Sequence, residues 1–308
     1  MSTPTSKPTQ GSHWSRILTI SLHTFTQLVR MKVFYFLAIF AVIAIGSNFF
    51  ELPQHVGPES VGASVLRSIK SWSLGAMTLF SVVLSIVATA LLLPKDVEDR
   101  TLYTILAKPV PRFDYLAGKL LGVLMLVFVS LALMDLLMIA VLQIRTSMVA
   151  VEQEAMARAM GWTQDAIDSL RAETVANGPN WSLQGAVFAV FLRASIMASL
   201  ALLISTFSSS TLFTTIVSFL IYFIGHFQAD ARDAYLQGGQ AGEGVLARIG
   251  TLLISLVLPD FQLFNVIDAV IEGQAMPLVA LGKLALVGLY YALFFTIASW
   301  FVFSDKEF

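Results

Sequence analysis

The sequence predicts an all-α integral membrane protein, because its residues are unusually apolar and poor in charge. Of the 308 residues, 56% are apolar, and the mean hydropathy is +0.77. Charged residues make up 13%, about half of the roughly 25% that is usual in soluble domains. A soluble protein of this size would have too little polar surface to cover its core. This composition excludes a soluble globular enzyme, a nucleic-acid-binding protein and a disordered chain. We therefore expect a single transmembrane domain over residues 1–308.

Six transmembrane helices account for most of the apolar residues. A helix needs about 20 predominantly apolar residues to cross a bilayer. Stretches of this kind, the fifth of them short, lie at residues 33–50, 72–93, 120–142, 185–207, 212–227 and 277–303. The sequence lacks the alternating segments of about ten residues that a membrane β-barrel requires.

Residues 13–32 are expected to form an N-terminal interfacial amphipathic helix. Trp14, Ile17, Leu18 and Leu22 recur at helical spacing, and polar residues mostly take the other side. A helix with such a pattern buries its apolar face at the boundary between headgroups and acyl chains. The alternative is a helix that packs on another protein surface. Its position directly before the first span favours the membrane interface.

The distribution of Lys and Arg predicts the orientation. With the N-terminus inside, the inner segments hold ten of these residues and the outer segments seven, although the outer segments are much longer. Cytoplasmic loops carry an excess of Lys and Arg. We therefore expect a multi-pass protein of the plasma membrane, a bacterial inner membrane, with both termini in the cytoplasm.

The outer helical cap, residues 143–184, is the longest predicted segment outside the membrane. It contains two expected helices, Val151–Met160 and Thr163–Ala176, separated by Gly161. Threonine is a favoured residue at the start of a helix, so Thr163 is expected to cap the second one.

A second outer region precedes the sixth span. The apolar stretch Ile249–Leu258 covers ten residues and ends at Pro259, so it is too short to cross a bilayer. We interpret it as a re-entrant outer segment. Residues 261–274 are expected to form a further short helix that leads back to the sixth span.

The cytoplasmic loop 94–119, between the second and third spans, holds a dense run of charge. An apolar stripe at helical spacing is formed by Val97, Leu102, Ile105 and Leu106. Pro109 ends this helix, because proline cannot donate a backbone hydrogen bond and disfavours helical geometry at the preceding residue. Two interpretations stay open. The helix binds a groove on a soluble partner, or it lies on the membrane surface without one.

The loop also contains a recognisable order of residues. It reads Glu98-Asp99-Arg100-Thr101-Leu102, then Leu106-Ala107-Lys108-Pro109-Val110-Pro111-Arg112, and then Gly118-Lys119. This pattern resembles ABC transporter permeases of the ABC-2 type, and most closely the branch linked to multicopper-enzyme maturation. One departure is Arg100, which stands where many members have glycine. The later segment Leu258–Asn265 also resembles the family's segment before the sixth span.

The resemblance implies that the loop contains a coupling helix, which receives motion from a separate ATPase subunit. ATP and Mg²⁺ would bind that subunit. A second permease copy and the lipid bilayer are the other implied partners, and a second short contact would lie at Ser208–Thr211. By position, the ATPase-coupling residues are Val97, Glu98, Asp99, Arg100, Thr101, Leu102, Ile105, Leu106, Lys108, Pro109 and Arg112.

The chain itself is not expected to be an enzyme or to bind a cofactor or metal. Gly118-Lys119 is followed by Leu120, whereas a phosphate-binding loop requires Ser or Thr there. The four histidines have no ligand-like spacing, and no nucleophile–base pair is apparent. Met156 and Met160 are one helical turn apart, and we assign them to the apolar side of the outer helix rather than to a metal site. If ATP drives this protein, the ATPase is another chain.

Three charged residues fall inside predicted spans: Asp135, Arg193 and Lys283. Charge in hydrocarbon costs at least about 2.5 kcal/mol, so each is a functional hypothesis. Spans three and four are consecutive and antiparallel, and Asp135 and Arg193 lie at similar distances from their outer ends. We expect either a structural pair that joins the two helices or a lining of the cargo path. Lys283 is also explained by a side chain that extends to the interface.

These observations leave three hypotheses for function. The first is the permease subunit of an ATP-driven exporter. The second is a membrane scaffold that transmits force from an ATPase without moving cargo. The third is a secondary transporter driven by an ion gradient, which is ranked last because inverted repeats and acids near the middle of the membrane, as in known examples, are not evident.

Overall fold

The computed structural model describes residues 12–46, 58–98, 111–208, 210–238 and 258–305. All regular structure in these residues is helical, which confirms the predicted all-α class. The elements are α1 (His13–Val29), α2 (Lys32–Gly46), α3 (Pro58–Glu98), α5 (Arg112–Ala159), α6 (Gln164–Ala176), α7 (Trp181–Phe207), α8 (Thr211–Gly238), the 3₁₀ turn η2 (Gln262–Phe264), α10 (Ile267–Ile271) and α11 (Leu278–Ser304).

Four helices, α3, α5, α7 and α11, are long and apolar enough to cross a membrane, which suggests a multi-pass membrane protein. They contain the predicted spans 72–93, 120–142, 185–207 and 277–303. Residues 33–46 of the first predicted span fall in α2, while its residues 47–50 lie outside the described residues, and the predicted span 212–227 falls in α8. In these helices the apolar parts are shorter, with 15 residues in α2 and the stretch Thr211–Phe227 in α8. The number of six crossings therefore stays a prediction.

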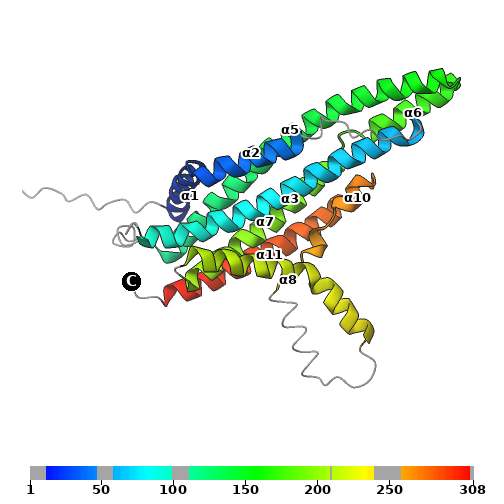
Figure 1. Ribbon diagram of the computed structural model, residues 1–308. Coiled ribbons are helices and arrows are strands. Elements are labelled where there is room, and N and C mark those ends of the chain that lie inside the picture. The colour runs from blue at the N-terminus through cyan, green and yellow to red at the C-terminus, as the bar shows by residue number, and fades with distance from the viewer. Residues whose placement is uncertain (1–11, 47–57, 99–110, 209, 239–257, 306–308) are drawn as a thin grey trace, which may run out of the picture.

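The long helices run side by side, with α1 at one end of the bundle and α6 at the other (Figure 1). We call these the α1 end and the α6 end. The end of α11 and both ends of the gap at 99–110 also lie at the α1 end. The later part of α8, coloured yellow, points away from the bundle (Figure 1).

Helix α7 is buried along most of its length. It is rich in small residues, and Ala186, Ala194 and Ala198 are fully buried. Small residues let helix backbones approach closely inside a membrane, where apolar burial gives no preference for protein over lipid. On α11, a Cβ atom at Gly288 would lie 3.1 Å from Leu192 of α7. The outer face of α11 exposes large apolar side chains such as Leu286 and Phe301, as expected of a surface in contact with lipid.

Helix α5 extends much further than the predicted third span. It begins at Arg112 and continues without a break to Ala159. The expected separate helix Val151–Met160 is therefore wrong: it is the last part of α5, because no glycine or proline occurs between Gly122 and Gly161. Gly161 has φ +76° and ends the helix, as predicted.

Helix α6 returns along the end of α5. It begins at Gln164, and Thr163 occupies the N-cap position, but the Thr163 hydroxyl makes no capping hydrogen bond. Thr174 Oγ1 donates to Gln153 Oε1 on α5 at 2.5 Å, and both side chains are buried. The region predicted as the outer cap thus consists of the last part of α5 and the antiparallel helix α6. It does not contain two separate helices that follow the third span.

A helix is present in the region predicted to be interfacial, but it ends earlier than residue 32. Helix α1 stops at Val29, and α2 begins at Lys32. Ser21 and Thr24 are fully buried where α1 packs on α5, and Ile20 also lies against α5, whereas Trp14 is 80% exposed. In a soluble protein, the face of α1 that carries Trp14 would be the buried one. This arrangement agrees with a helix whose apolar stripe faces the membrane.

The contact between α1 and α5 depends on two glycines one helical turn apart. A Cβ atom at Gly118 would lie 2.7 Å from Ile20 Cβ, and one at Gly122 would lie 2.6 Å from Thr24 Cβ. Neither position has room for a side chain. The pair has the small-xxx-small spacing that allows close crossing of helices in membranes.

The segment before α11 differs from the expected single helix over residues 261–274. It consists of η2 and α10, separated by Asn265, whose ψ of 67° is not helical. Asp260 Oδ1 accepts a hydrogen bond from the backbone N–H of Gln262, which fixes a local turn at the start of the segment. The expected re-entrant stretch Ile249–Leu258 lies outside the described residues except for Leu258.

Candidate functional site

The predicted coupling helix lies mostly outside the described residues, but the helices that flank it are described. Val97 and Glu98 are the last two residues of α3, so α3 extends into the predicted loop 94–119. Arg112 is the first residue of α5, preceded by Pro111 in the N-cap position. The coupling positions outside the described residues are Asp99, Arg100, Thr101, Leu102, Ile105, Leu106, Lys108 and Pro109.

A buried ion pair connects the two helices that flank this loop. Lys119 Nζ on α5 lies 2.6 Å from Asp96 Oδ2 on α3, and the two side chains are only 3% and 7% exposed. Tyr115 donates its phenolic hydrogen to the same Asp96 oxygen at 2.5 Å. Breaking a buried ion pair leaves an uncompensated charge in a medium of low dielectric constant. We call Asp96, Tyr115 and Lys119 the loop anchor.

The next acidic residue, Asp114, connects α5 to the beginning of α1. The Asp114 carboxylate is buried, and its Oδ2 lies 3.0 Å from His13 Nδ1 and 3.1 Å from Arg16 Nε. His13 and Arg16 are on successive turns of α1. The first turns of α1 are therefore held beside the first turn of α5.

Arg112 connects the same region to the end of α11. Its guanidinium Nη1 donates to the backbone oxygen of Phe303 at 2.9 Å and also to that of Ser304. The last carbonyls of a helix have no partner within the helix, and a cation placed there also interacts favourably with the helix dipole. The rings of Tyr115 and Phe303 stack, with centroids 6.0 Å apart. Four helices, α1, α3, α5 and α11, thus meet where the loop begins and ends.

The predicted pairing of Asp135 with Arg193 is wrong, since each side chain has a different partner. Asp135 Oδ1 accepts from Gln184 Nε2 at 3.1 Å. Arg193 Nη2 donates to the backbone oxygen of Phe261 at 3.3 Å. Asp135 is level with Gln184, near the start of α7, and Arg193 lies nine residues further along that helix, or about 13 Å at 1.5 Å per residue. The expected register failed because α5 continues past residue 142, the expected outer end from which the position of Asp135 was counted.

Arg193 belongs instead to a buried contact between α7, α8 and the segment before α11. Arg193 is 3% exposed. The Phe261 residue whose oxygen it binds also donates its backbone N–H to Gly225 O on α8 at 3.1 Å. The side chain of Gln262 donates to His226 O at 2.9 Å. On the other side, the Tyr291 hydroxyl of α11 donates to Leu258 O at 3.4 Å. The segment 258–264 is thus hydrogen-bonded to three helices.

Aromatic rings fill the same contact. The ring of Tyr222 lies 4.6 Å from that of His226 and 5.4 Å from that of Phe261, between centroids. Tyr222 also interacts electrostatically with Arg193. At Gly225 a Cβ atom would lie 2.6 Å from both the Phe261 ring and Pro259 O, so only glycine fits there. We call Arg193, Tyr222, Gly225, His226 and Phe261 the Arg193 cluster.

The sequence interpretation missed most of this cluster. Tyr222 and His226 were not singled out, although both are polar residues within the predicted fifth span. Asp260, which is buried beside them, was noted only within a segment that resembles the family. An inventory of every polar side chain in the apolar stretches, rather than of the charged ones alone, would have named Tyr222 and His226.

Lys283 joins neither site. It lies on the exposed side of α11, so the three intramembrane charges occupy three separate places. Among the described residues, no group of three or more His, Asp or Glu side chains is arranged to hold a metal ion.

Comparison with known proteins gives no family assignment. No protein-family model matches the chain, and no curated protein matches its sequence. The loop anchor is therefore the structural feature from which a function is proposed.

Proposed function

We propose that this chain is the membrane-spanning permease subunit of an ATP-binding-cassette exporter, driven by a separate ATPase subunit through the loop 94–119. The observation that carries the proposal is the buried ion pair between Asp96 and Lys119. It joins the helix that enters the loop to the helix that leaves it. The resemblance of Glu98–Arg112 to the coupling segment of ABC-2 permeases supports the same conclusion.

The loop anchor supports transmission of force. A push on the loop acts on α3 and α5 as one unit, because separating them would leave Asp96 or Lys119 buried without its partner. Asp114 extends this unit to α1, and Arg112 extends it to α11. Since α3 also packs along α7, motion of the unit changes the surroundings of the central helix. ATP binding to the partner would in this way shift the bundle between arrangements open to either side.

The proposal includes an arrangement in the membrane. The chain crosses six times, with α2 and α8 as the two short spans, and the α1 end faces the cytoplasm of a bacterial inner membrane. The paired helices α5 and α6 then project on the outer side. A second permease copy completes the transporter. The excess of Lys and Arg on the proposed inner side supports this orientation.

Co-purification with an ATPase tests the proposal. The full chain is tagged, expressed in its native membrane and isolated in mild detergent, and ATP hydrolysis by the bound fraction is measured. Leu102→Asp with Ile105→Asp places charge on the apolar stripe and is expected to abolish the ATPase activity recovered. Tyr103→Asp with Thr104→Asp adds the same charge off the stripe, and is expected to retain it.

Recovery of undiminished ATPase activity with the Leu102→Asp, Ile105→Asp variant would count against coupling through this loop. Transport into inside-out vesicles that contain an ATPase-inactive partner then separates an exporter from a scaffold. An exporter loses ATP-dependent uptake of cargo, whereas a scaffold shows no uptake with either form of the partner.

A further inference from the structure

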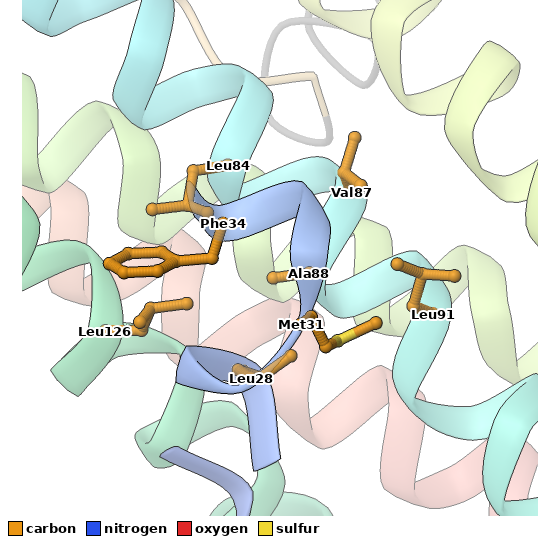
Figure 2. Close-up of a pocket in the computed structure, with 8 residues that line it drawn as sticks. All are labelled: Leu28, Met31, Phe34, Leu84, Val87, Ala88, Leu91 and Leu126. Atoms are coloured by element: carbon orange, nitrogen blue, oxygen red, sulfur yellow. The ribbon is translucent and has the colours of Figure 1, made fainter. Parts of the chain in front are cut away.

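An apolar groove lies where α1 meets α2, bounded by α3 and α5. Figure 2 shows side chains from the α1–α2 junction, α3 and α5 that point toward one another around it. Leu28, Leu84, Ala88 and Leu126 are buried and form its floor. The rim is partly exposed and includes Met31, Phe34, Val87 and Leu91. Every lining side chain is apolar.

Two exposed cations flank the groove. Arg30, at the end of α1, and Lys32, the first residue of α2, are the neighbours of Met31. Both are exposed, and neither forms an ion pair with another described residue. Arg16, about four turns earlier on α1, differs because it pairs with Asp114. Two exposed positive charges thus lie directly beside an apolar surface.

The position of the break between α1 and α2 fits the level of lipid headgroups. On its N-terminal side, α1 turns an apolar stripe outward, as an interfacial helix does. On its C-terminal side, α2 is almost wholly apolar from Val33 onward. A residue between an interfacial helix and an apolar one lies at the boundary of headgroups and hydrocarbon, where Lys and Arg attract anionic lipids.

We propose that this groove is a specific site for an anionic phospholipid. One acyl chain lies along the partly exposed rim, over Val87 and Leu91 of α3, and the headgroup phosphate is bound by Arg30 and Lys32. An acyl chain is the occupant of choice because the groove offers no hydrogen-bonding side chain and opens on a surface that contacts the bilayer. The proposal rests on the membrane placement in the proposed function, but not on the ATPase.

Native mass spectrometry of the full chain in detergent micelles tests the site. The first bound lipid is titrated with phosphatidylglycerol and with phosphatidylcholine of the same acyl chains. Phosphatidylglycerol is expected to bind at least about tenfold more tightly, because each basic residue near the headgroup contributes about 1 kcal/mol. Arg30→Ala with Lys32→Ala is expected to remove that difference. Arg67→Ala with Arg171→Ala, which removes two exposed cations elsewhere, is expected to leave it unchanged.

The acyl-chain part of the site is tested with variants that fill the groove. Val87→Phe and Leu91→Phe each add a ring at the partly exposed rim of α3, and are expected to weaken binding of both lipids about tenfold. Leu286→Phe on the exposed face of α11 is the control. Two groove variants are used so that a folding defect in one, detected by gel filtration, leaves the other as the test.

Three outcomes would overturn the proposal. The first is equal affinity for the two phospholipids, and the second is a preference that survives Arg30→Ala with Lys32→Ala. The third is unchanged binding in whichever groove variants fold. Since no ATPase is present, failure here would leave coupling through the loop 94–119 unaffected, and failure of the co-purification experiment would leave the lipid site unaffected.

Discussion

Lys119 Nζ lies 2.6 Å from Asp96 Oδ2, and this buried contact joins α3 to α5 on either side of the loop 94–119. Tyr115 donates to the same oxygen, so the carboxylate has both a cation and a hydroxyl donor. A buried network that is fully partnered is rigid, and one that loses a member is costly. Removing Lys119 alone should therefore cost more stability than removing Lys119 together with the charge of Asp96.

Lys119→Met is expected to destabilise the protein by about 3–5 kcal/mol, since it removes the Lys119 cation from its buried contact with the Asp96 carboxylate. The measurement is the thermal unfolding midpoint in detergent micelles. Adding Asp96→Asn to Lys119→Met is expected to restore part of the loss, because the uncompensated charge is removed as well.

The control for this prediction is Arg158→Met on the same helix. Arg158 pairs with Glu154 one turn away, but its side chain is 60% exposed. Exposed pairs of this spacing contribute about 0.3–0.5 kcal/mol, so the midpoint should hardly move. If Lys119→Met and Arg158→Met lower the thermal unfolding midpoint equally, the loop anchor stabilises the protein no more than an exposed ion pair does.

Gly122→Leu is expected to separate α1 from α5. A Cβ atom at Gly122 already lies 2.8 Å from Ser21 O, so a larger side chain forces the helices apart. The chain has no cysteine, which makes Ser21→Cys a clean reporter at a position with 0% exposure. With Gly122→Leu, the reporter should react at least about tenfold faster with a water-soluble thiol reagent, in line with loss of burial.

Gly75→Leu provides the comparison, because a Cβ atom at Gly75 on α3 meets nothing within 4 Å. In a chain that carries Gly75→Leu, the Ser21→Cys reporter should react with the thiol reagent as slowly as it does in a chain without that substitution. If Gly122→Leu also leaves the reaction slow, the close crossing of α1 and α5 is not required to cover Ser21.

Gly225→Ala is expected to displace the segment 258–264 from α8. The added methyl would lie 2.6 Å from Pro259 O, which is backbone and cannot move as a side-chain end does. The backbone hydrogen bond from Phe261 to Gly225 should weaken. Hydrogen exchange measured by mass spectrometry should therefore become faster in peptides that contain Phe261, and stay unchanged in peptides from α7.

Gly75→Ala, at an exposed helical position with open space around it, controls for a general effect of alanine. It should leave exchange at Phe261 unchanged, and it should slightly favour α3 because alanine has the higher helix propensity. Unchanged exchange at Phe261 in Gly225→Ala would mean that the segment tolerates a side chain at this contact.

Much of the fold was accessible from the sequence because the bilayer imposes a simple length rule. Apolar stretches of about 20 residues identify membrane helices, and α3, α5, α7 and α11 each contain one. The amphipathic pattern at Trp14 to Leu22 similarly predicted α1. The loop anchor could not be predicted in the same way, since Asp96, Tyr115 and Lys119 belong to no local pattern and meet only through the packing of α3 on α5.

The relative register of neighbouring helices was the main error. Counting from the expected outer ends of the third and fourth spans placed Asp135 level with Arg193. That count assumes that each helix stops near the membrane surface. Helix α5 continues to Ala159 because no residue before Gly161 breaks it, and Asp135 is level with Gln184 instead. Register depends on side-chain packing along the whole contact, which a single sequence does not display.

A double-mutant cycle distinguishes the two arrangements directly. Asp135→Asn and Arg193→Gln are expected to change stability independently, within about 0.5 kcal/mol of additivity, as is usual for sites without a shared partner. Asp135→Asn and Gln184→Leu are expected to deviate from additivity by more than that, because Gln184 donates to the Asp135 carboxylate. Both cycles are measured by thermal unfolding in the same detergent. Strong coupling between Asp135 and Arg193 would contradict the register of α5 against α7 described above. It would restore the ion pair between the two spans that their similar depth first suggested, and Arg193 would then no longer be assigned to holding Phe261.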